Sequence, residues 1–216
     1  HGVARLESGL WGRFNAENLL LAAGILLAAG WPLARVAAAL TDCTAPPGRM
    51  QRVPGSAGQP AVLVDFAHTA EALGKALQAA RAHCRGRLWC VFGCGGNRDS
   101  GKRAPMGRAA VETADHVIVT DDNPRDEDSR QIIADILAGM DSRDTVQVIP
   151  DRAAAIQRAI HSAASDDVIL IAGKGHEQTQ TVAGVSRPFS DLAVAAAALS
   201  GAQQWQGAGG RHRDLR

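Results

Sequence analysis

Short, largely apolar runs alternate with helical patterns along residues 57–200. The runs predict strands at residues 61–65, 88–92, 116–120, 145–149 and 168–172. Between the runs, apolar residues recur at helical spacing. Near-continuous apolar strands separated by helices predict an α/β domain with a mostly parallel sheet and helices on both of its faces.

Polar residues and prolines mark where the helices of this domain begin. Pro105 is well placed as the first residue of a helix that runs to residue 114. Residues 179–189 read as two short strands around Gly184, which predicts a hairpin. Four side chains are predicted to cap helix N-termini: Thr69, Ser129, Asp151 and Ser190.

The N-terminal part has a different pattern. Residues 19–29 are apolar on nearly all sides, which predicts a buried helix with Asn15 as its N-cap, and Pro32 can start a second helix through residue 40. Residues 42–58 are rich in proline and glycine, which indicates a linker. The predicted parts are a helical segment at residues 1–56, the α/β domain at 57–200 and a frayed tail at 201–216.

Composition narrows the function. Of 216 residues 46% are hydrophobic and the net charge is +1, so there is enough apolar material for a core but no basic footprint for nucleic acid or a membrane surface. The longest apolar stretch is too short to span a bilayer. The four cysteines form no CxxC pair, so reduced thiols and a cytoplasmic location are expected.

The most informative chemistry follows the run at residues 116–120. Arg125 presents a planar guanidinium suited to a carboxylate, Asp121 and Asp122 offer acceptors for an ammonium group, and Pro124 stiffens the loop. A loop that carries both signs of charge at a strand end predicts a site for a zwitterion such as an amino acid. The alternative is an ordinary acidic turn that caps the next helix.

Other strand ends carry polar groups too. If four of the strands share one edge, His68 and Arg98 lie in one cleft with residues 122–125 and 173–177. The glycine turn at residues 93–96 lacks the GxGxxG spacing, so a nicotinamide-dependent oxidoreductase is a distant alternative. The chain has neither a GxxxxGK[ST] phosphate loop nor an HExxH motif, and no catalytic residue or metal ligand is assigned.

Together these motifs resemble the Mur ligases of peptidoglycan synthesis. They occur in the order of that family. The matching stretches are residues 12–18 (GRFNAEN), 47–50 (PGRM), 64–69 (VDFAHT), 92–99 (FGCGGNRD), 101–103 (GKR), 120–125 (TDDNPR), 151–152 (DR) and 172–177 (AGKGHE).

The resemblance implies an architecture. Mur ligases have a domain that binds the UDP-sugar, a central domain with the phosphate loop, magnesium and a carbamylated lysine, and a Rossmann-like domain that binds the incoming amino acid. The chain looks like the helical end of the central ATPase domain followed by the whole third domain. Ligase activity is therefore not expected from these residues alone, and most magnesium ligands would lie outside them.

The resemblance also implies site residues and partners. The DNPR motif is the form associated with meso-diaminopimelate rather than lysine, added to UDP-N-acetylmuramoyl-L-alanyl-D-glutamate. Substrate-binding residues would be Arg98, Asp122, Asn123, Pro124, Arg125, Gly173 and Glu177. ATP-binding residues would be Asn18, Arg49, Asp65 and His68. The alternative is a free-standing amino-acid-binding module or one half of a split ligase.

Overall fold

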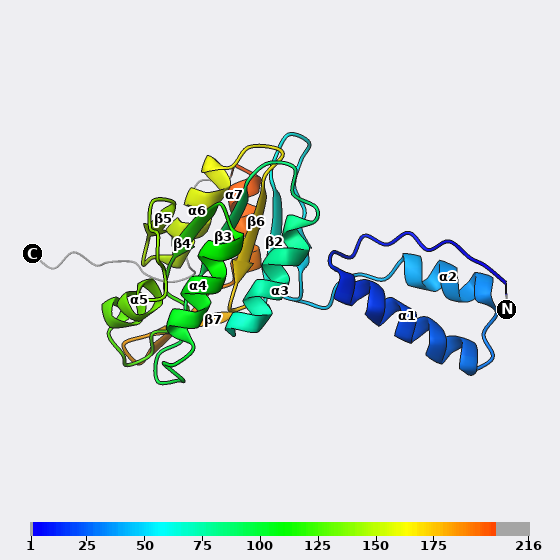
Figure 1. Ribbon diagram of the computed structural model, residues 1–216, viewed down its shortest axis with the longest axis horizontal. Coiled ribbons are helices and arrows are strands. Elements are labelled where there is room, and N and C mark those ends of the chain that lie inside the picture. The colour runs from blue at the N-terminus through cyan, green and yellow to red at the C-terminus, as the bar shows by residue number, and fades with distance from the viewer. Residues whose placement is uncertain (1, 202–216) are drawn as a thin grey trace, which may run out of the picture.

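The computed structural model describes residues 2–201, and its centre is a six-stranded sheet. The strands are β1 (Gln51–Val53), β2 (Ala61–Asp65), β3 (Leu88–Phe92), β4 (His116–Val119), β5 (Val146–Val148) and β6 (Val168–Ala172). Their order is β1-β2-β6-β3-β4-β5, and all neighbours run parallel except β1, which pairs antiparallel with β2 at one edge (Figure 1). The predicted mostly parallel sheet is confirmed.

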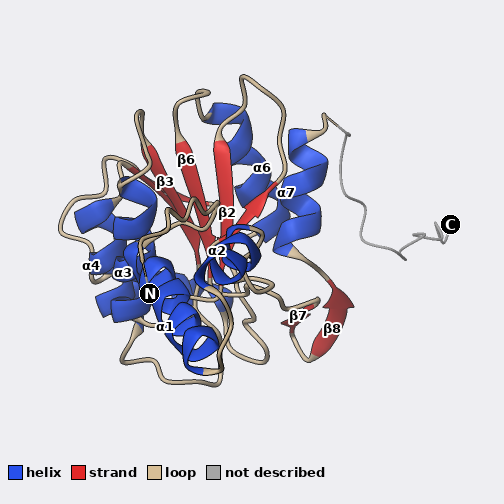
Figure 2. Cartoon of the chain, turned by 90° about the vertical axis from the view of Figure 1, so that its right-hand side faces the viewer, coloured by secondary structure: helices blue, strands red, loops and turns tan. Residues whose placement is uncertain are grey.

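Helices cover both faces of this sheet, as predicted. The described helices are α1 (Arg13–Ala28), α2 (Leu33–Thr41), α3 (Ala70–Arg81), α4 (Arg103–Thr113), α5 (Ser129–Leu137), α6 (Arg152–Ser162) and α7 (Asp191–Leu199). One core, which includes Leu73, Met106 and Ile136, lies under α3, α4 and α5. A second core, which includes Ile156 and Val194, lies under α6 and α7, and Figure 2 shows the strands between the two layers.

Burial of the strands explains their continuous apolar runs. Every residue of β3 and β6 is buried. In β2, Leu63 faces the core under α3, whereas Val62 and Val64 face the core under α6 and α7. Because successive side chains of a strand point to opposite faces, a sheet with a core on each side needs apolar residues at every position.

Three of the predicted helix caps are confirmed. The side chains of Thr69, Asp151 and Ser190 each accept a hydrogen bond from a backbone N–H in the first turn of α3, α6 and α7. Such a bond satisfies one of the N–H groups that a helix start leaves without a partner in the helix.

The predicted starts of α4 and α5 are wrong by one or two residues. The carboxylate of Asp128 caps α5, and Ser129 is its first helical residue. Helix α4 begins at Arg103, before Pro105. Proline is tolerated there because the N–H groups of a first turn have no partner within the helix.

A hairpin of β7 (Thr179–Val182) and β8 (Val185–Pro188) follows β6, as predicted. Its turn residues Ala183 and Gly184 have φ angles of 49° and 72°. Two consecutive left-handed residues are typical of the tight turn whose twist matches the flanking strands. The hairpin forms a separate two-stranded sheet beside the C-terminal edge of the main one.

The prediction that α1 is buried is wrong for the described chain. Leu20, Leu21 and Ile25 are 72%, 65% and 62% exposed. Helix α1 packs on α2 through a small core that includes Leu19 and Val36, and the two helices project from the sheet (Figure 1). An all-round apolar helix needs partners on more than one side, and α2 supplies one side.

Asn15 is not the N-cap of α1. The helix begins at Arg13 after Gly12, and Asn15 lies inside its first turn, where its Nδ2 donates to the carbonyl of Trp11 at 2.8 Å. The Trp11 ring stacks on His83, which follows α3, with 4.5 Å between ring centroids. This contact attaches the start of α1 to the α/β domain.

The linker predicted at residues 42–58 contains β1, which is part of the main sheet. The sheet therefore begins before the predicted boundary at residue 57. Among residues 2–201, no helix is both long and apolar enough to cross a membrane. The tail predicted to fray lies outside the described residues beyond Gly201.

A buried ion pair lies beneath the C-terminal edge of the sheet. The side chains of Arg152 and Asp191 are both 0% exposed. Nε and one terminal nitrogen of Arg152 each donate to an Asp191 oxygen at 2.8 Å, and that terminal nitrogen also donates to the carbonyl of Ala172 at 2.9 Å. The pair joins α6, α7 and β6.

We expect Arg152→Met to lower the free energy of unfolding by about 3–5 kcal/mol, because it leaves Asp191 buried without a counter-charge. Urea unfolding followed by circular dichroism measures the change. The double variant Arg152→Met/Asp191→Leu recovers most of the loss, since it removes both charges. A loss below about 1 kcal/mol in the single variant would contradict this role.

Candidate functional site

The C-terminal ends of four parallel strands meet at one edge of the sheet. The amide of Gly173, after β6, donates to the carbonyl of Asp65 at the end of β2, at 3.1 Å. The amide of Thr120, after β4, donates to the carbonyl of Phe92 at the end of β3, at 2.9 Å. The strand order therefore places the four loops of the predicted site at one edge.

The glycine turn after β3 packs directly against the loop of residues 120–125. A Cβ atom on Gly93 would lie 2.0 Å from the carbonyl oxygen of Thr120, and one on Gly96 would lie 1.9 Å from that of Pro124. Only glycine permits so close an approach of two backbones. The turn is thus a support for the neighbouring loop.

Arg125 is held by backbone geometry as well as by its side chain. Its φ is 56°, and its amide donates to the carbonyl of Thr181 in β7 at 2.9 Å. Nη1 of its half-buried guanidinium donates to the carbonyl of Gly96 at 2.8 Å. A Cβ atom on Gly95 would lie 2.9 Å from this nitrogen and 3.8 Å from Cγ of Arg98, so both arginines lie against the glycine turn.

Asn123 is nearly buried, and its side-chain amide is engaged at both ends. Nδ2 donates to Oδ1 of Asp122 at 3.1 Å and to Oε2 of Glu177 at 2.9 Å, and Oδ1 accepts from the amide of Thr181 at 2.9 Å. This orientation follows from the chemistry, because carboxylates only accept and a backbone N–H only donates. Asn123 therefore organises the site through its neighbours.

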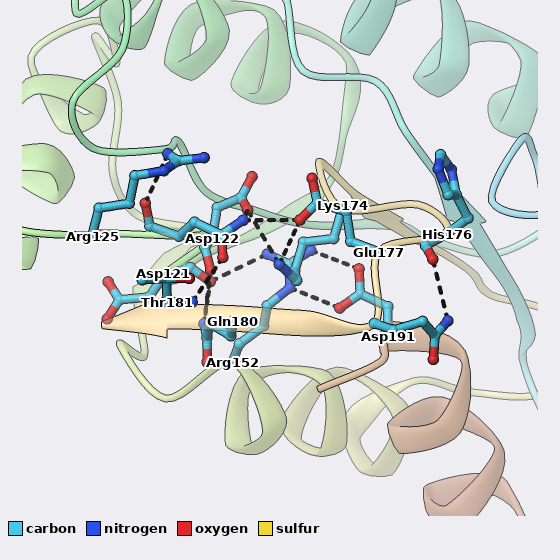
Figure 3. Close-up of polar contacts among 12 residues, drawn as sticks. Asp121, Asp122, Arg125, Arg152, Lys174, His176, Glu177, Gln180, Thr181 and Asp191 are labelled. Carbon is cyan, nitrogen blue, oxygen red and sulfur yellow. Dashed lines mark hydrogen bonds and ion pairs between the residues drawn. The ribbon is translucent and has the colours of Figure 1, made fainter. Parts of the chain in front are cut away.

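Lys174 occupies the centre of the site, and its side chain is 0% exposed. Nζ lies 2.9 Å from Oε2 of Glu177 and 3.7 Å from Oδ1 of Asp122 (Figure 3). Its neighbours Gly173 and Gly175 both have positive φ angles, 115° and 53°. The glycines thus allow the turn that directs this lysine inward.

These contacts set the charge state of the carboxylates. Burial raises the pKa of Glu177, but the hydrogen bond and charge of Lys174, with help from Asn123 and Arg125, bring the pKa below its ordinary value. Burial raises the pKa of Asp122, although Arg152 and Lys174 act in the opposite direction. Glu177 is therefore the ionised, half-exposed carboxylate of the site.

Asp121 does not offer the free acceptor that the sequence suggested. Its carboxylate accepts a short hydrogen bond from the hydroxyl of Ser129, the first residue of α5. Burial raises the pKa of Asp121, and this bond lowers it in part. Asp122 does face an ammonium group, as expected of an acceptor, but that group belongs to Lys174.

Three of the four residues predicted to contact ATP lie near Phe66, and the fourth lies in α1. Both carboxylate oxygens of Asp65 accept backbone hydrogen bonds at 2.7 Å, from the amides of residues 50 and 67. The Arg49 guanidinium lies 4.8 Å from the centroid of the Phe66 ring, and the rings of His68 and His176 also contact Phe66. Asn18 is an exposed residue of α1, the helix that projects from the sheet with α2 (Figure 1).

Two supports of the site were not identified from the sequence. Gln180 in β7 donates to the carbonyl of Asp122 at 2.9 Å. Arg103, at 1% exposure, donates to both carboxylate oxygens of Glu127 at 2.6 and 2.7 Å and to Asp135 at 2.9 Å. The adjacent basic residues Lys102 and Arg103 were a visible signal, but the acidic partners of Arg103 lie 24 and 32 positions further along the chain.

The sequence and the fold were compared with protein families, with curated relatives and with solved structures. Residues 48–175 match the family model described as Mur ligase, glutamate ligase domain. The chain belongs to the Mur ligase family. Two relatives named UDP-N-acetylmuramoyl-L-alanyl-D-glutamate–2,6-diaminopimelate ligase are similar to it, one from Xylella fastidiosa (53% identical over 91% of this chain) and one from Pseudomonas aeruginosa (52% over 93%).

The Mur ligase chain spans only 40% and 41% of the length of these two relatives. A solved structure of a ligase with the same name superposes with a TM-score of 0.74 at 40% identity, over 92% of this chain and 41% of that one. The UDP-N-acetylmuramate–alanine ligase of Thermotoga maritima, at 22% identity over 80% of this chain and 37% of that one, with a TM-score of 0.62, shares the fold.

We expect the contribution of Glu127 to stability to disappear in acid. The hydrogen bond from Arg103 lowers its pKa from 4.5 to about 2. A carboxylate whose pKa is lower in the folded than in the unfolded state stabilises the fold at pH values above its unfolded pKa. For Glu127 this stabilisation is lost as pH falls from about 4.5 to about 2. Glu127→Gln then costs roughly 1 kcal/mol near neutral pH and little near pH 2.

Urea unfolding of both proteins across this pH range gives the difference. Glu17→Gln is the matched control, because Glu17 lies in an exposed pair with Arg13. A difference between Glu127→Gln and the wild type that stays constant with pH would contradict the assignment.

Proposed function

We propose that this chain is the amino-acid-binding part of a meso-diaminopimelate-adding ligase, UDP-N-acetylmuramoyl-tripeptide synthetase. The observation that carries the proposal is 53% identity to a relative with that activity in its name. In addition, Arg125 and Glu177, which carry opposite charges, both contact Asn123 in the loop of residues 120–125. The residues proposed to bind the substrate are Arg98, Asp122, Asn123, Pro124, Arg125, Gly173 and Glu177.

The reaction would be ATP-dependent amide formation. The D-glutamyl side-chain carboxylate of the UDP-linked dipeptide is phosphorylated, the free amine of diaminopimelate attacks the acyl phosphate, and phosphate leaves. Catalysis of such a transfer rests mainly on positioning and on neutralising charge. This chain would place the amine, in the cytoplasm, where UDP-linked precursors are made.

The geometry supports recognition of a ligand end with two opposite charges. Asn123 touches both partners: its carbonyl accepts from Arg125 at 3.4 Å, and its Nδ2 donates to Glu177 at 2.9 Å. The guanidinium suits the distal carboxylate of diaminopimelate, and the ionised Glu177 suits its ammonium. Lysine lacks that carboxylate and would leave Arg125 with unmatched donors, at a cost of about 1–3 kcal/mol.

We also propose that four residues of this chain contact ATP. Arg49, Asp65 and His68 lie beside Phe66 and would form part of the wall of the ATP site, with Asn18 contributed by α1. Residues 1–56 would belong mainly to the central ATP-binding domain. The rest of that domain would pack on α1 and cover the exposed leucines of this helix. The magnesium ligands are proposed to lie mostly in the central domain, outside this chain. Among the described residues, no group of three or more His, Cys, Asp or Glu side chains could hold a metal ion.

We expect Arg125→Ala to weaken binding of meso-diaminopimelate by about 10- to 100-fold, because a charge-assisted bond to the distal carboxylate is lost. Binding of lysine changes little, since lysine makes no such bond. Calorimetry with the purified chain measures both affinities. Arg108→Ala, at an exposed position of α4, is the control. Tighter binding of lysine than of diaminopimelate by the wild type would overturn the assignment.

We also expect no ligase activity from these 216 residues alone, since the sequence contains no phosphate loop. Incubation with ATP, magnesium, the UDP-linked dipeptide and diaminopimelate should yield no tripeptide product by mass spectrometry. A full-length relative run in parallel shows that the assay works. Product formation would favour a free-standing catalyst over a ligase part.

A further inference from the structure

The carboxylate of Glu177 is held on one side only. Oε2 accepts hydrogen bonds from Nζ of Lys174 and from Nδ2 of Asn123, both at 2.9 Å. Within the part of the chain that the structure describes, Oε1 accepts no hydrogen bond, and the Glu177 side chain is 37% exposed. One oxygen is thus occupied by the protein, and the other remains for a ligand.

The two donors are rigidly placed. Lys174 is 0% exposed and Asn123 is 7% exposed. The other bonds of the Asn123 amide, to Asp122 and to the amide of Thr181, hold its orientation (Figure 3 draws the surrounding network). Donors that cannot turn away keep the carboxylate ionised and in one orientation.

We propose that Lys174 and Asn123 are positioning residues, which hold Glu177 ionised with Oε1 left for an ammonium group of the amino acid. This inference rests on the proposed function. It assigns to these two residues the preference for a diamino ligand over a monoamino ligand of the same length. Lys174 then needs no contact with the ligand, and Asn123 orients Glu177 in addition to the ligand contact proposed for it above.

A purely structural role for Lys174 would be to neutralise the buried Asp122. The distances favour Glu177, because Nζ lies 2.9 Å from its Oε2, within hydrogen-bond range, but 3.7 Å from Oδ1 of Asp122. The two roles differ in their effect on ligand preference. Loss of a structural support weakens all ligands alike, whereas loss of positioning weakens only those with the second ammonium.

The test compares meso-diaminopimelate with L-2-aminopimelate, which keeps both carboxylates and lacks one ammonium. Dissociation constants are measured on the 216-residue chain by ligand-observed NMR. The wild type is expected to prefer diaminopimelate by about 10- to 100-fold, the usual worth of a charge-assisted hydrogen bond. Lys174→Met is expected to lose most of this preference while its affinity for aminopimelate stays near the wild-type value.

A double-variant cycle separates the roles further. In a Glu177→Gln background the preference is already lost, so adding Lys174→Met should produce no further change. Lys75→Met, an exposed lysine of α3 paired with Glu71, is the matched control and keeps the wild-type preference. An unchanged preference in Lys174→Met, or an equal loss for both ligands, overturns the proposal while the proposed function stands.

The proposed function fails separately, if the wild type does not bind diaminopimelate or if Glu177→Gln leaves the preference intact. Circular dichroism checks that each variant folds. If Lys174→Met does not fold, Asn123→Ala decides, because it removes one donor and leaves every charge in place. A preference reduced severalfold then supports the positioning role, and an unchanged preference overturns it.

Discussion

Two buried cations organise the C-terminal edge of the sheet. Arg152 and Lys174 are removed from water, and a desolvated charge is tolerated only beside partners at short distance. Two of the partners come from other elements: Asp191, at the start of α7, pairs with Arg152, and Asp122, from the loop after β4, lies near Lys174. Glu177 lies on the same loop after β6 as Lys174. The loops are therefore not independent, since moving one leaves a buried charge without its counter-ion.

Glycine makes this arrangement geometrically possible. The loops after β3, β4 and β6 approach one another so closely that side chains at Gly93, Gly96 or Gly173 would collide with their neighbours. Runs of glycine at strand ends suggest phosphate cradles when read alone. Here they let one loop pack on another, and the inward turn of Lys174 belongs to the same packing.

The sequence correctly predicted the structural features that depend on local sequence pattern. The order of strands and helices, the cap at Thr69 and the hairpin turn at Gly184 all follow from residues close together in the chain. The sequence did not predict contacts between residues that lie far apart along the chain. Nothing near Arg152 indicates Asp191, which is 39 positions away, and nothing near Asn123 shows that its amide is already engaged. The apolar pattern of residues 19–29 likewise gave no sign of how few partners α1 meets.

The hairpin β7–β8 has a consequence for motion. Its backbone is joined to the loop of residues 120–125 through the amides of Arg125 and Thr181, and the second of these also orients Asn123. Any fluctuation that lifts the exposed hairpin breaks these two bonds and releases the amide that steadies Glu177. Protection of these two amides from hydrogen exchange, and the affinity proposed for a ligand with an ammonium group, would then both report the same opening equilibrium of the hairpin.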